Sequence, residues 1–528
     1  MSKSRPKELW KAVKSSTGQQ DSHHSNSKLL QHPDEVNTYF AKISTDANYC
    51  SEDVTRLYSP LSNRDTPTPP SPFILEIMLR KLKNTSAGVD DIPSWFFRSC
   101  SYEIAEAVSF IISRTFATGR VPENWRTAIV TPIPKTSNPK LLSQFRPISV
   151  TPILSRLTEK IIVSQYLKPA MSEAKLLQDQ YAYRNTGSTT CALIKLLDYI
   201  TSAFENNRFV HTLYIDFSKA FDIVDHVILI KKLNKLFIPP NIKNWIISFL
   251  SNRSQIVKCN GSCSARTCIN RGIVQGSALG PFLFCIMVSD LHPLSHYNTL
   301  LKYADDITYA IPEKSDQSVI NEYDHTKTWA IDNKLVINEQ KTGVQCLIRH
   351  KKIVKPAGEF GNIHEVNEFR ILGVTLDDTL TFSTHISNIL NTCYQRFYLL
   401  KLLRDQGANT DSLHTIYMSL IVNRISYCLS AWGGFLSQSD IGRIDSMFRK
   451  AKRYGYTHTI YDTFGLISKV DRCLFDNIKS NPNHCLYDLL PATKNFLGRE
   501  RGHSFALPLC KIDCHRKSFM PRCLFSFL

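Results

Sequence analysis

The sequence predicts an α+β fold with a mainly helical C-terminal part. Segments with strand patterning alternate with helical segments, but without the regular βαβ rhythm of a doubly wound sheet. Residues 382–453 have an almost entirely helical pattern. Hydrophobic residues make up 43% of the 528 residues, which is enough to bury a substantial core. We therefore expect a folded chain of a few domains or subdomains.

The N-terminal part is expected to divide at a proline-rich stretch. Residues 1–72 are polar and end in TPTPPSP, which predicts a disordered linker with one short helix over 33–43. From Phe73 onward, apolar residues recur at helical spacing over 73–82, and a second helix is expected over 104–118. The main folded part is therefore expected to begin at Phe73.

The central part is expected to supply the sheets. The expected strands are 125–132, 211–216 and 343–349, a polar hairpin over 256–267, a strand pair around an acidic turn over 300–311, and a strand pair or bend over 369–376. The expected helices are 153–167, 187–207, 218–236, 241–250 and 317–333, and residues 146–150 are expected to form a turn that leads into the first of them.

A large basic surplus favours a polyanionic partner, either nucleic acid or a membrane surface. Lys and Arg number 64 against 46 Asp and Glu, for a net charge of +18 and a pI of about 9.2. The sequence has no run of about 18 apolar residues, so we expect no membrane partner. The basic segment 1–16 lacks the apolar core of a secretory signal, so we expect the protein in the nucleus or the cytoplasm, not secreted.

The basic surplus is concentrated toward the end of the chain. Residues 396–528 contain 19 basic and 10 acidic residues, which is half of the net charge. They include the run Arg449, Lys450, Lys452 and Arg453. Such a run is either a solvated helix face or a surface for a phosphate backbone, and the sequence leaves both interpretations open.

The 15 cysteines are expected to be reduced thiols, many of them in the core. Cys485, Cys510, Cys514 and Cys523 lie near the end of the chain, with His503 and His515 close by in sequence. Their spacing matches no zinc-binding pattern, so the sequence favours core thiols over a zinc site.

Three carboxylates stand out because of their apolar surroundings. Asp305 and Asp306 interrupt the apolar stretch LLKYADDITYAI (300–311), and Asp216 ends the stretch HTLYID (211–216). Carboxylates are rarely buried unless they are paired or bind a metal. If the two strand ends converge, the three carboxylates suit two Mg²⁺ ions in phosphoryl transfer. The alternative is a structural pair of acidic turns.

Tyr303-Ala304-Asp305-Asp306 resembles the Y-x-D-D signature of reverse transcriptases. Several other segments resemble reverse transcriptase motifs and follow in the family's order: RPIS (146–149), YIDFSKAFD (214–222), GIVQGSALGPFLF (272–284), LVIN with Lys341-Thr342 (335–342), and FRILGV (369–374). The sequences of the first two palm motifs resemble those of non-LTR retrotransposon enzymes. So do three further segments: 86–134, AWG (431–433) and RCLF (522–525).

This resemblance implies a right-hand polymerase fold of fingers, palm and helical thumb. The implied organisation is a linker at 1–72, an N-terminal extension of the fingers at 73–140, fingers and palm at 141–380, a thumb at 381–455 and a basic C-terminal region at 456–528. The implied activity is RNA-directed DNA polymerisation on template RNA and primer DNA with deoxynucleoside triphosphates. The implied cofactor is two Mg²⁺ ions, with Mn²⁺ as an alternative.

The resemblance also implies roles for individual residues. Asp216, Asp305 and Asp306 would be catalytic metal ligands. Phe221 lies where the family has a steric gate against the ribose 2′-hydroxyl, and the alternative is a core aromatic on an amphipathic helix.

Further positions would lie at the nucleotide. Gln275 would contact the incoming nucleotide, and Gly272 and Gly276 would allow close backbone approach; an ordinary loop into a helix is the alternative. Lys341 would lie at the triphosphate and protonate the pyrophosphate, unless it is simply solvated. Arg146 would clamp phosphate, unless it belongs to a buried structural ion pair.

The chain also departs from the family's pattern. The second palm motif has Val274 where the non-LTR group usually has Pro, which is expected to loosen the loop before Gln275. About 70 polar residues precede the core, too few for the endonuclease domain that many members carry, so we expect a separate endonuclease as partner. The alternative functions are a catalytically silent nucleic-acid-binding scaffold and a truncated element remnant.

Overall fold

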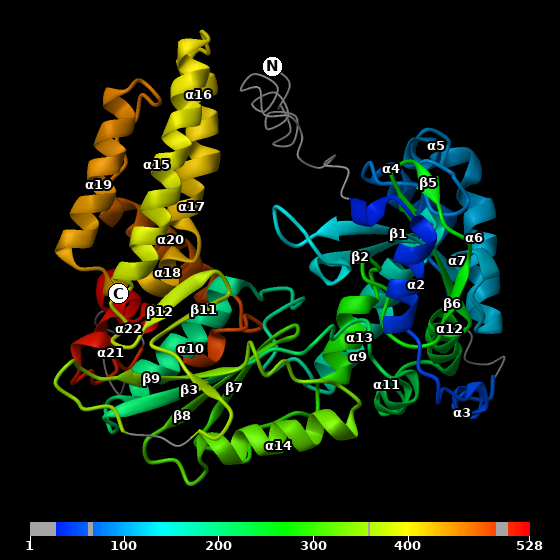
Figure 1. Ribbon diagram of the computed structural model, residues 1–528, viewed down its shortest axis with the longest axis horizontal. Coiled ribbons are helices and arrows are strands. Elements are labelled where there is room, and N and C mark those ends of the chain that lie inside the picture. Colours follow the sequence, from blue (N-terminus) through cyan, green and yellow to red (C-terminus); the bar gives the residue numbers. More distant parts are fainter. Residues whose placement is uncertain (1–27, 62–66, 357–359, 493–504) are drawn as a thin grey trace, which may run out of the picture.

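The computed structural model describes residues 28–61, 67–356, 360–492 and 505–528. In Figure 1 a mainly antiparallel sheet, here called the palm sheet, lies below a group of long helices, and a second sheet with its own helices lies to its right. The palm sheet has the order β10 (His364–Glu365), β9 (Gly343–Ile348), β3 (Phe209–Ile215), β8 (Asp306–Pro312) and β7 (Thr299–Tyr303). The predicted strands at 211–216, 300–311 and 343–349 are thus confirmed.

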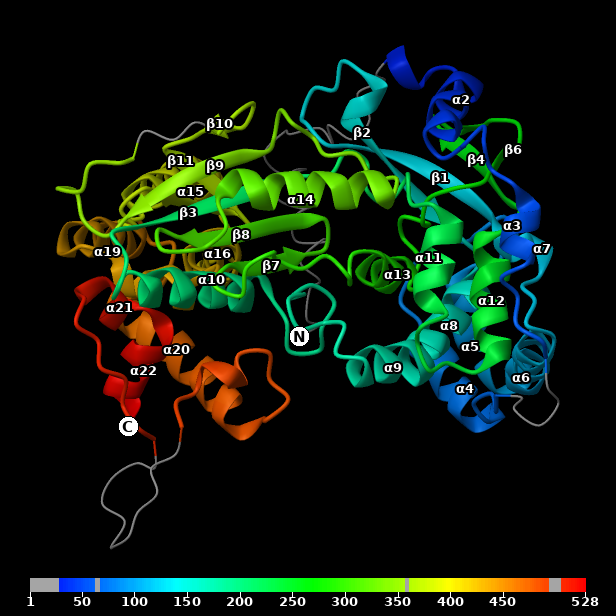
Figure 2. The same cartoon turned by 90° about the horizontal axis from the view of Figure 1, so that it is seen from below.

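Alternate residues of the palm sheet face two different cores. Val210 and Tyr214 of β3 belong to the core that includes helix α10 (Thr189–Ala203). Leu213 and Ile215 belong to the core that includes helix α14 (Val319–Asp332), which lies across the near face of the sheet in Figure 2. The alternation follows from the two-residue period of a strand, and it holds the ends of β3 and β8 rigidly in place.

The second sheet, here called the finger sheet, is built around β1 (Thr127–Pro134). Among the described residues it has the order β2 (Phe145–Val150), β1, β4 (Arg253–Cys259) and β5 (Ser262–Cys263), and β6 (Thr267–Ile269) also pairs with β4. The helices of this side are α3 (Ser51–Thr55), α4 (Pro72–Arg80), α5 (Ser94–Ser99), α6 (Ser101–Thr118), α7 (Glu123–Arg126), α8 (Ile153–Ile162), α9 (Lys168–Glu173), α11 (His226–Leu233), α12 (Pro240–Leu250) and α13 (Gly280–Met287).

The helical part begins after the hairpin of β11 (Glu368–Ile371) and β12 (Val374–Asp377). Its helices are α15 (Ser383–Asp405), α16 (Thr410–Tyr417), α17 (Asn423–Ser426), α18 (Leu429–Trp432), α19 (Gln438–Arg453), α20 (Thr463–Ser480), α21 (Asp513–Lys517) and α22 (Phe519–Phe527). The helices α15, α16 and α19 rise from the palm sheet opposite the finger sheet (Figure 1). The predicted helical region 382–453 is therefore confirmed. Within the described part of the chain, no helix is both long and apolar enough to cross a membrane.

Three expectations differ from the structure. Residues 146–150 form strand β2 instead of a turn, paired with β1 so that Pro147 lies opposite Pro132. Proline weakens the local signal for a strand but is tolerated at a sheet edge, which is where β2 lies.

The helix expected over 218–236 begins only at His226. Ser218 N–H donates to the carbonyl of Val336 at 2.8 Å, and Lys219 has a φ of 51°, so the preceding segment is held in turns. Asp225 then caps α11 by accepting from Ile228 N at 2.9 Å.

The disorder expected for residues 1–72 does not hold for the described part. The predicted helix over 33–43 is present as α2 (Pro33–Ile43), and it packs Val36 and Phe40 into a small core with Val257 of the finger sheet. Asn37 also donates to the carbonyl of Ala265 at 2.8 Å. Residues 1–27 and 62–66 of the expected linker lie outside the described residues.

Candidate active site

The tight turn between β7 and β8 positions Asp305 and Asp306. Tyr303 pairs with Asp306 across the hairpin, so Ala304 and Asp305 form the turn. Ala304 has a φ of 57°, a conformation that costs a residue with a side chain some free energy. Its N–H donates to Oε1 of the buried Gln180 at 2.9 Å, which holds the turn in place. Gln180 was not predicted from the sequence, because no local pattern links it to this turn.

Asp216 follows directly after β3, beside the same turn. Ile215 pairs with Ile307 of β8, so the end of β3 lies next to Asp306. The Oδ2 atom of Asp216 accepts from Asn338 Nδ2 and from Lys341 Nζ, each at 3.1 Å. The two strand ends therefore converge, which is the condition that a shared metal site requires. Asn338 was missed as a site residue, although it lies in a segment that carries one of the motifs.

The environment of these carboxylates opposes their negative charge. Burial raises the pKa of Asp305, and the charge of Asp216 raises it further. Asp306 is exposed to the cleft, yet the protein around it excludes enough water to raise its pKa to about 6, helped by the charges of Asp305 and Asp216. A bound cation would relieve this repulsion. Three carboxylates are hard oxygen donors of the kind that Mg²⁺ and Mn²⁺ prefer, so the residues present fit divalent cations.

The loop that carries Gln275 is fastened to both neighbouring segments. Gln275 Nε2 donates to Asp222 Oδ1 at 2.7 Å, and its carbonyl accepts from Ser149 N at 2.7 Å. Gly276 has a φ of 112°, and a Cβ atom there would lie 2.6 Å from the carbonyl oxygen of Ser149. Gly272 has a φ of 87°, and a Cβ atom there would lie 2.5 Å from the carbonyl oxygen of Asp222. Both glycines are therefore required by close backbone approach.

The loop before Gln275 is not left loose by the absence of the family's proline. Val274 is buried, and Ile273 N–H donates to the carbonyl of Phe221 at 2.7 Å. Asp222 supports the loop through Gln275, and burial raises the pKa of Asp222 to about 6. Asp222 is a supporting residue that the sequence analysis quoted in a motif without assigning it a role.

Phe221 contacts both the cleft and the hydrophobic core. It is half-buried and lines the cleft, and its ring stacks on the ring of Phe284 at 4.6 Å between centroids with a 16° interplanar angle. Residues 218–223 are turns and bends, so Phe221 does not lie on the amphipathic helix that the alternative required. The position is compatible with a steric gate, which remains a prediction.

Basic side chains also line the cleft. Arg146 is exposed and, among the residues that the structure describes, has no ion-pair partner, so the alternative of a buried ion pair does not hold. Lys135 and Lys219 line the same cleft. Burial lowers the pKa of Lys135, and the nearby charge of Arg146 lowers it further. Neither lysine was singled out from the sequence, since an isolated Lys carries no local signal.

One open cleft is lined by the site residues that the sequence predicted, except Gly272. Its lining includes Arg146, Asp216, Phe221, Gln275, Gly276, Asp305, Asp306 and Lys341. Residues from distant parts of the sequence therefore meet as three carboxylates, a cluster of cations, an aromatic ring and a glycine-bearing loop. This arrangement can hold a polyphosphate between cations and place metal-bound oxygen atoms near a reacting hydroxyl. The individual roles remain predictions.

Comparison with known proteins identifies the central segment. Residues 133–376 match the family model described as reverse transcriptase (RNA-dependent DNA polymerase). The chain is 28% identical over 407 residues to "Probable RNA-directed DNA polymerase from transposon BS" of Drosophila melanogaster, covering 73% of this chain and 45% of that protein. It is 26% identical over 401 residues to "RNA-directed DNA polymerase from mobile element jockey" of the same species, covering 71% and 43%.

The chain thus spans less than half the length of these curated relatives. Among solved structures, a telomerase from Candida albicans in complex with a fragment of telomeric RNA aligns at 12% identity and a TM-score of 0.36. That alignment covers 75% of this chain and 68% of the other.

Proposed function

Because residues 133–376 form a reverse transcriptase domain of the non-LTR retrotransposon type, we propose that the chain is an RNA-directed DNA polymerase that transfers deoxynucleotides to a primer 3′-hydroxyl. One observation carries the proposal. Asp216, Asp305 and Asp306 come from the ends of neighbouring palm strands and face one cleft together with the loop of Gln275. A scaffold that only bound nucleic acid would not need three carboxylates in a phosphate-binding cleft.

Reverse transcriptases generally depend on a divalent metal ion. We propose that Asp216, Asp305 and Asp306 hold two Mg²⁺ ions, or Mn²⁺ in their place. When bound, such ions lower the pKa of the primer hydroxyl and stabilise charge on the leaving pyrophosphate. Asn338 orients the Asp216 carboxylate by donating to its Oδ2 atom at 3.1 Å. Gln180 keeps the turn of Asp305 and Asp306 rigid, so the donor atoms need little rearrangement.

The cations of the cleft act on the triphosphate. Lys341 exchanges its ion pair with Asp216 for the incoming nucleotide and donates a proton to the departing pyrophosphate. Arg146 supplies a planar guanidinium for bidentate phosphate contact, and Lys135 adds charge beside it. Gln275 and Gly276 bring the loop backbone against the nucleotide, and Phe221 excludes a ribose 2′-hydroxyl.

The partners follow from this chemistry. We propose template RNA, primer DNA and deoxynucleoside triphosphates as substrates, in the nucleus or the cytoplasm where these occur. The net charge of +18 supports binding to a phosphate backbone. A primer 3′-end is required, and we propose that a separate endonuclease supplies it.

The test is primer extension on an RNA template with Mg²⁺, using the parent protein and Asp305→Asn. The variant removes one anionic metal ligand while keeping the side-chain shape. Extension should fall by roughly 100-fold or more, since a lost metal ligand costs several kcal/mol of transition-state stabilisation. Binding of the RNA–DNA duplex should be nearly unchanged. Asp324→Asn, at an exposed position of α14, is the matched control and should extend like the parent.

The competing function is a catalytically silent scaffold or element remnant on the same fold. It predicts duplex binding by the parent with no extension under any metal. Extension by the parent and by Asp305→Asn at equal rates would instead contradict the metal assignment while keeping the polymerase.

A further inference from the structure

A second cluster of metal-ligating side chains lies away from the cleft. Cys191, His484 and Cys485 are all buried, with exposed fractions of 2%, 8% and 4%. One ligand atom of each lies within 4.8 Å of the ligand atoms of the other two. Among the described residues this is the one group of three such side chains brought that close. The carboxylates of the cleft belong to a separate part of the palm.

The cluster joins two segments that are far apart in the sequence. Cys191 lies in the first turn of α10, where its N–H donates to the Ser188 cap at 3.1 Å. His484 and Cys485 lie in the segment after α20. Thr186 holds the two together, because its hydroxyl accepts from Cys485 N at 3.0 Å and its carbonyl accepts from the thiols of Cys191 at 3.5 Å and of Cys485 at 3.3 Å. The two sulfur atoms are therefore fixed side by side by backbone contacts.

The geometry suits a tetrahedral ion. Zinc–sulfur and zinc–nitrogen bonds of about 2.3 and 2.0 Å place the ligands of a tetrahedral site roughly 3.5–4 Å apart. The cluster needs only a small contraction to reach that separation. Two thiolates and one imidazole are soft and borderline donors, which favour zinc over Mg²⁺ or Ca²⁺.

The surroundings favour a thiolate at Cys191 and leave room for a fourth ligand. The N-terminal turn of α10 stabilises a negative sulfur on Cys191. Two thiolates neutralise the charge of one Zn²⁺ ion. His484 Nδ1 accepts from Leu486 N at 3.1 Å, a hydrogen bond that a zinc ion bound at Nδ1 would replace. His484 and Cys485 also line an open cavity together with Tyr181 and Arg184, from which water can reach the cluster.

We propose that Cys191, His484 and Cys485 form a structural zinc site, with water in the fourth position, that pins the segment after α20 to the palm helix α10. The site lies behind the catalytic turn, because Cys191 belongs to the core against which Tyr303 packs. Zinc there would fasten the C-terminal region to the element that supports Asp305 and Asp306. The proposal is independent of the polymerase activity.

The sequence could not have predicted this site. In the sequence, Cys485 is grouped only with the other C-terminal cysteines and with His503 and His515. The spacing of that group is not the spacing of a zinc motif. The partners are Cys191, which lies in α10 far earlier in the chain, and the adjacent His484. Cys510, Cys514, Cys523 and His515 form no such group among the described residues, and His503 lies outside them.

The test measures bound metal in the full chain, purified under reducing conditions and reconstituted with zinc. Elemental analysis should find about one zinc per chain in the parent, as a single site requires. Cys191→Ser, Cys485→Ser and His484→Ala should each lose most of it. Cys393→Ser, which alters a buried thiol outside the cluster, is the matched control and should keep it. Replacement by Co²⁺ should give the parent a thiolate-to-metal absorption band that Cys485→Ser lacks.

If the variants fail to fold, a measurement on the parent chain tests the proposal in their place. Zinc should protect Cys191 and Cys485 from alkylation, as mapped by mass spectrometry, and a chelator should expose both. No zinc in the reconstituted parent would overturn the proposal, and so would equal zinc in the parent and all three cluster variants. Protection that reductant abolishes but chelator does not would show a disulfide between Cys191 and Cys485 instead.

Discussion

Phe221 shows how one side chain can serve packing and selectivity together. One face of the ring stacks on Phe284, which is fully buried, while the residue also lines the cleft beside Gln275. The stack fixes the ring in place, and a fixed ring is what a steric gate requires. A mobile side chain could move aside for a 2′-hydroxyl and would discriminate poorly.

We expect Phe221→Ala to admit ribonucleotides. The ratio of kcat/KM for a ribonucleotide to that for the matching deoxynucleotide should rise by roughly 10-fold or more, since steric discrimination in a pocket is typically worth about 1–3 kcal/mol. Single-nucleotide extension with each substrate measures the ratio. Phe284→Leu disturbs the stack from the buried side and serves as the control, with a smaller change expected. An unchanged ratio in Phe221→Ala would leave the residue a packing role only.

At the residue scale the sequence predicted the reactive groups but not their supports. Asp216, Asp305 and Asp306 were predicted for two reasons. Carboxylates in apolar strands are rare, and the motifs that contain these residues follow each other along the chain in the family's order. Gln180 and Lys135 were missed because their importance comes only from what the fold places beside them. A single Gln or Lys in a polar segment has no distinguishing pattern before the tertiary contacts are known.

The elements most difficult to predict were those set by distant pairing. Strand β2 has a proline and little strand character of its own, and its partner β1 defines it. Residues 218–225 have helical composition but are bent by the bond from Ser218 N to the Val336 carbonyl, across more than a hundred residues. By contrast, α4, α6, α12 and α14 have a local periodicity that needed no such information, and their positions were predicted closely.

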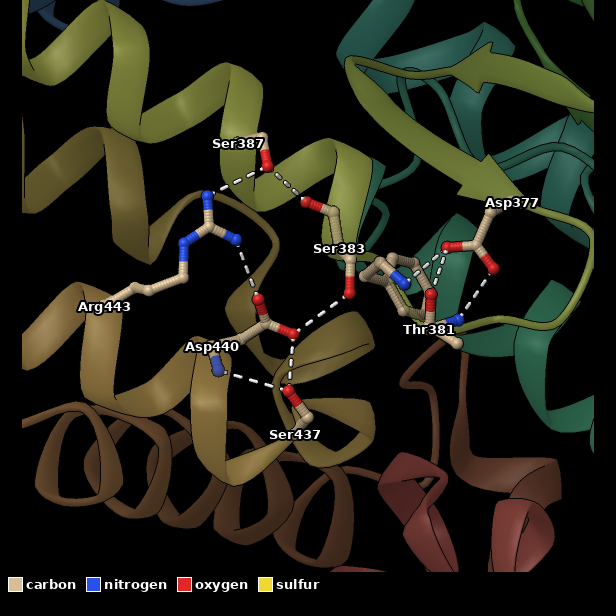
Figure 3. A network of polar contacts seen from close by, with 8 residues as sticks. Asp377, Thr381, Ser383, Ser387, Ser437, Asp440 and Arg443 are labelled. Atoms are coloured by element: carbon tan, nitrogen blue, oxygen red, sulfur yellow. Dashed lines mark hydrogen bonds and ion pairs between the residues drawn. The ribbon is translucent and has the colours of Figure 1, made fainter.

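The junction between hairpin β11–β12 and helix α15 is built from a polar network (Figure 3). Asp377 at the end of β12 accepts from Thr381 N at 2.8 Å and Thr381 Oγ1 at 2.9 Å. Asp440 of α19 accepts from Ser383 at 3.1 Å and from Arg443 at 3.0 Å. These contacts tie the first turn of α15 to both the palm and α19. We infer that the angle of the long helices to the palm is set at this point.

His385, one turn into α15, makes this junction sensitive to acid. Its ring is buried against Trp432 at 5.2 Å between centroids, and its Nδ1 accepts from Thr375 N at 3.3 Å. Burial, together with the charges of Arg370 and Arg424, lowers the pKa of His385 to about 4. Because the folded-state pKa lies below the unfolded value of about 6.5, the stabilisation is complete above pH 6.5 and is lost as the pH falls toward 4.

We therefore expect His385→Asn to weaken the acid sensitivity of folding. The Asn side chain keeps an acceptor for Thr375 N but does not titrate. Between pH 7.5 and 5 the parent should lose about 2 kcal/mol of stability through this one group, and the variant should lack that part of the loss. Urea unfolding at both pH values measures it. His458→Asn, at an exposed position, is the control. Parallel losses in parent and His385→Asn would contradict the assignment.

At the scale of the whole molecule, exposed basic side chains gather at two places. Arg146, Lys135, Lys219 and Lys341 line the cleft. The end of α19 carries Arg449, Lys452 and Arg453, all exposed. Positive charges at such places can contact the backbone of a duplex, because phosphates carry a sequence-independent charge.

We expect binding of an RNA–DNA duplex to weaken steeply with salt. A plot of log affinity against log salt concentration should have a slope of about −3 or steeper, because each neutralised phosphate contributes roughly 0.7–0.9. Fluorescence anisotropy at several salt concentrations measures the slope with Asp305→Asn, which removes turnover. A flat plot would contradict a surface that tracks the backbone.

The same measurement separates the two interpretations of the basic run on α19. If the helix contacts phosphates, Arg449→Gln with Lys452→Gln should make the slope shallower by about 1.5 and lower the affinity at low salt. If it is a solvated face, the slope should stay the same. Lys351→Gln with Lys352→Gln removes two exposed charges from the loop after β9 and controls for net charge alone. An equal effect of both double variants would show that the total charge, not the position of α19, governs binding.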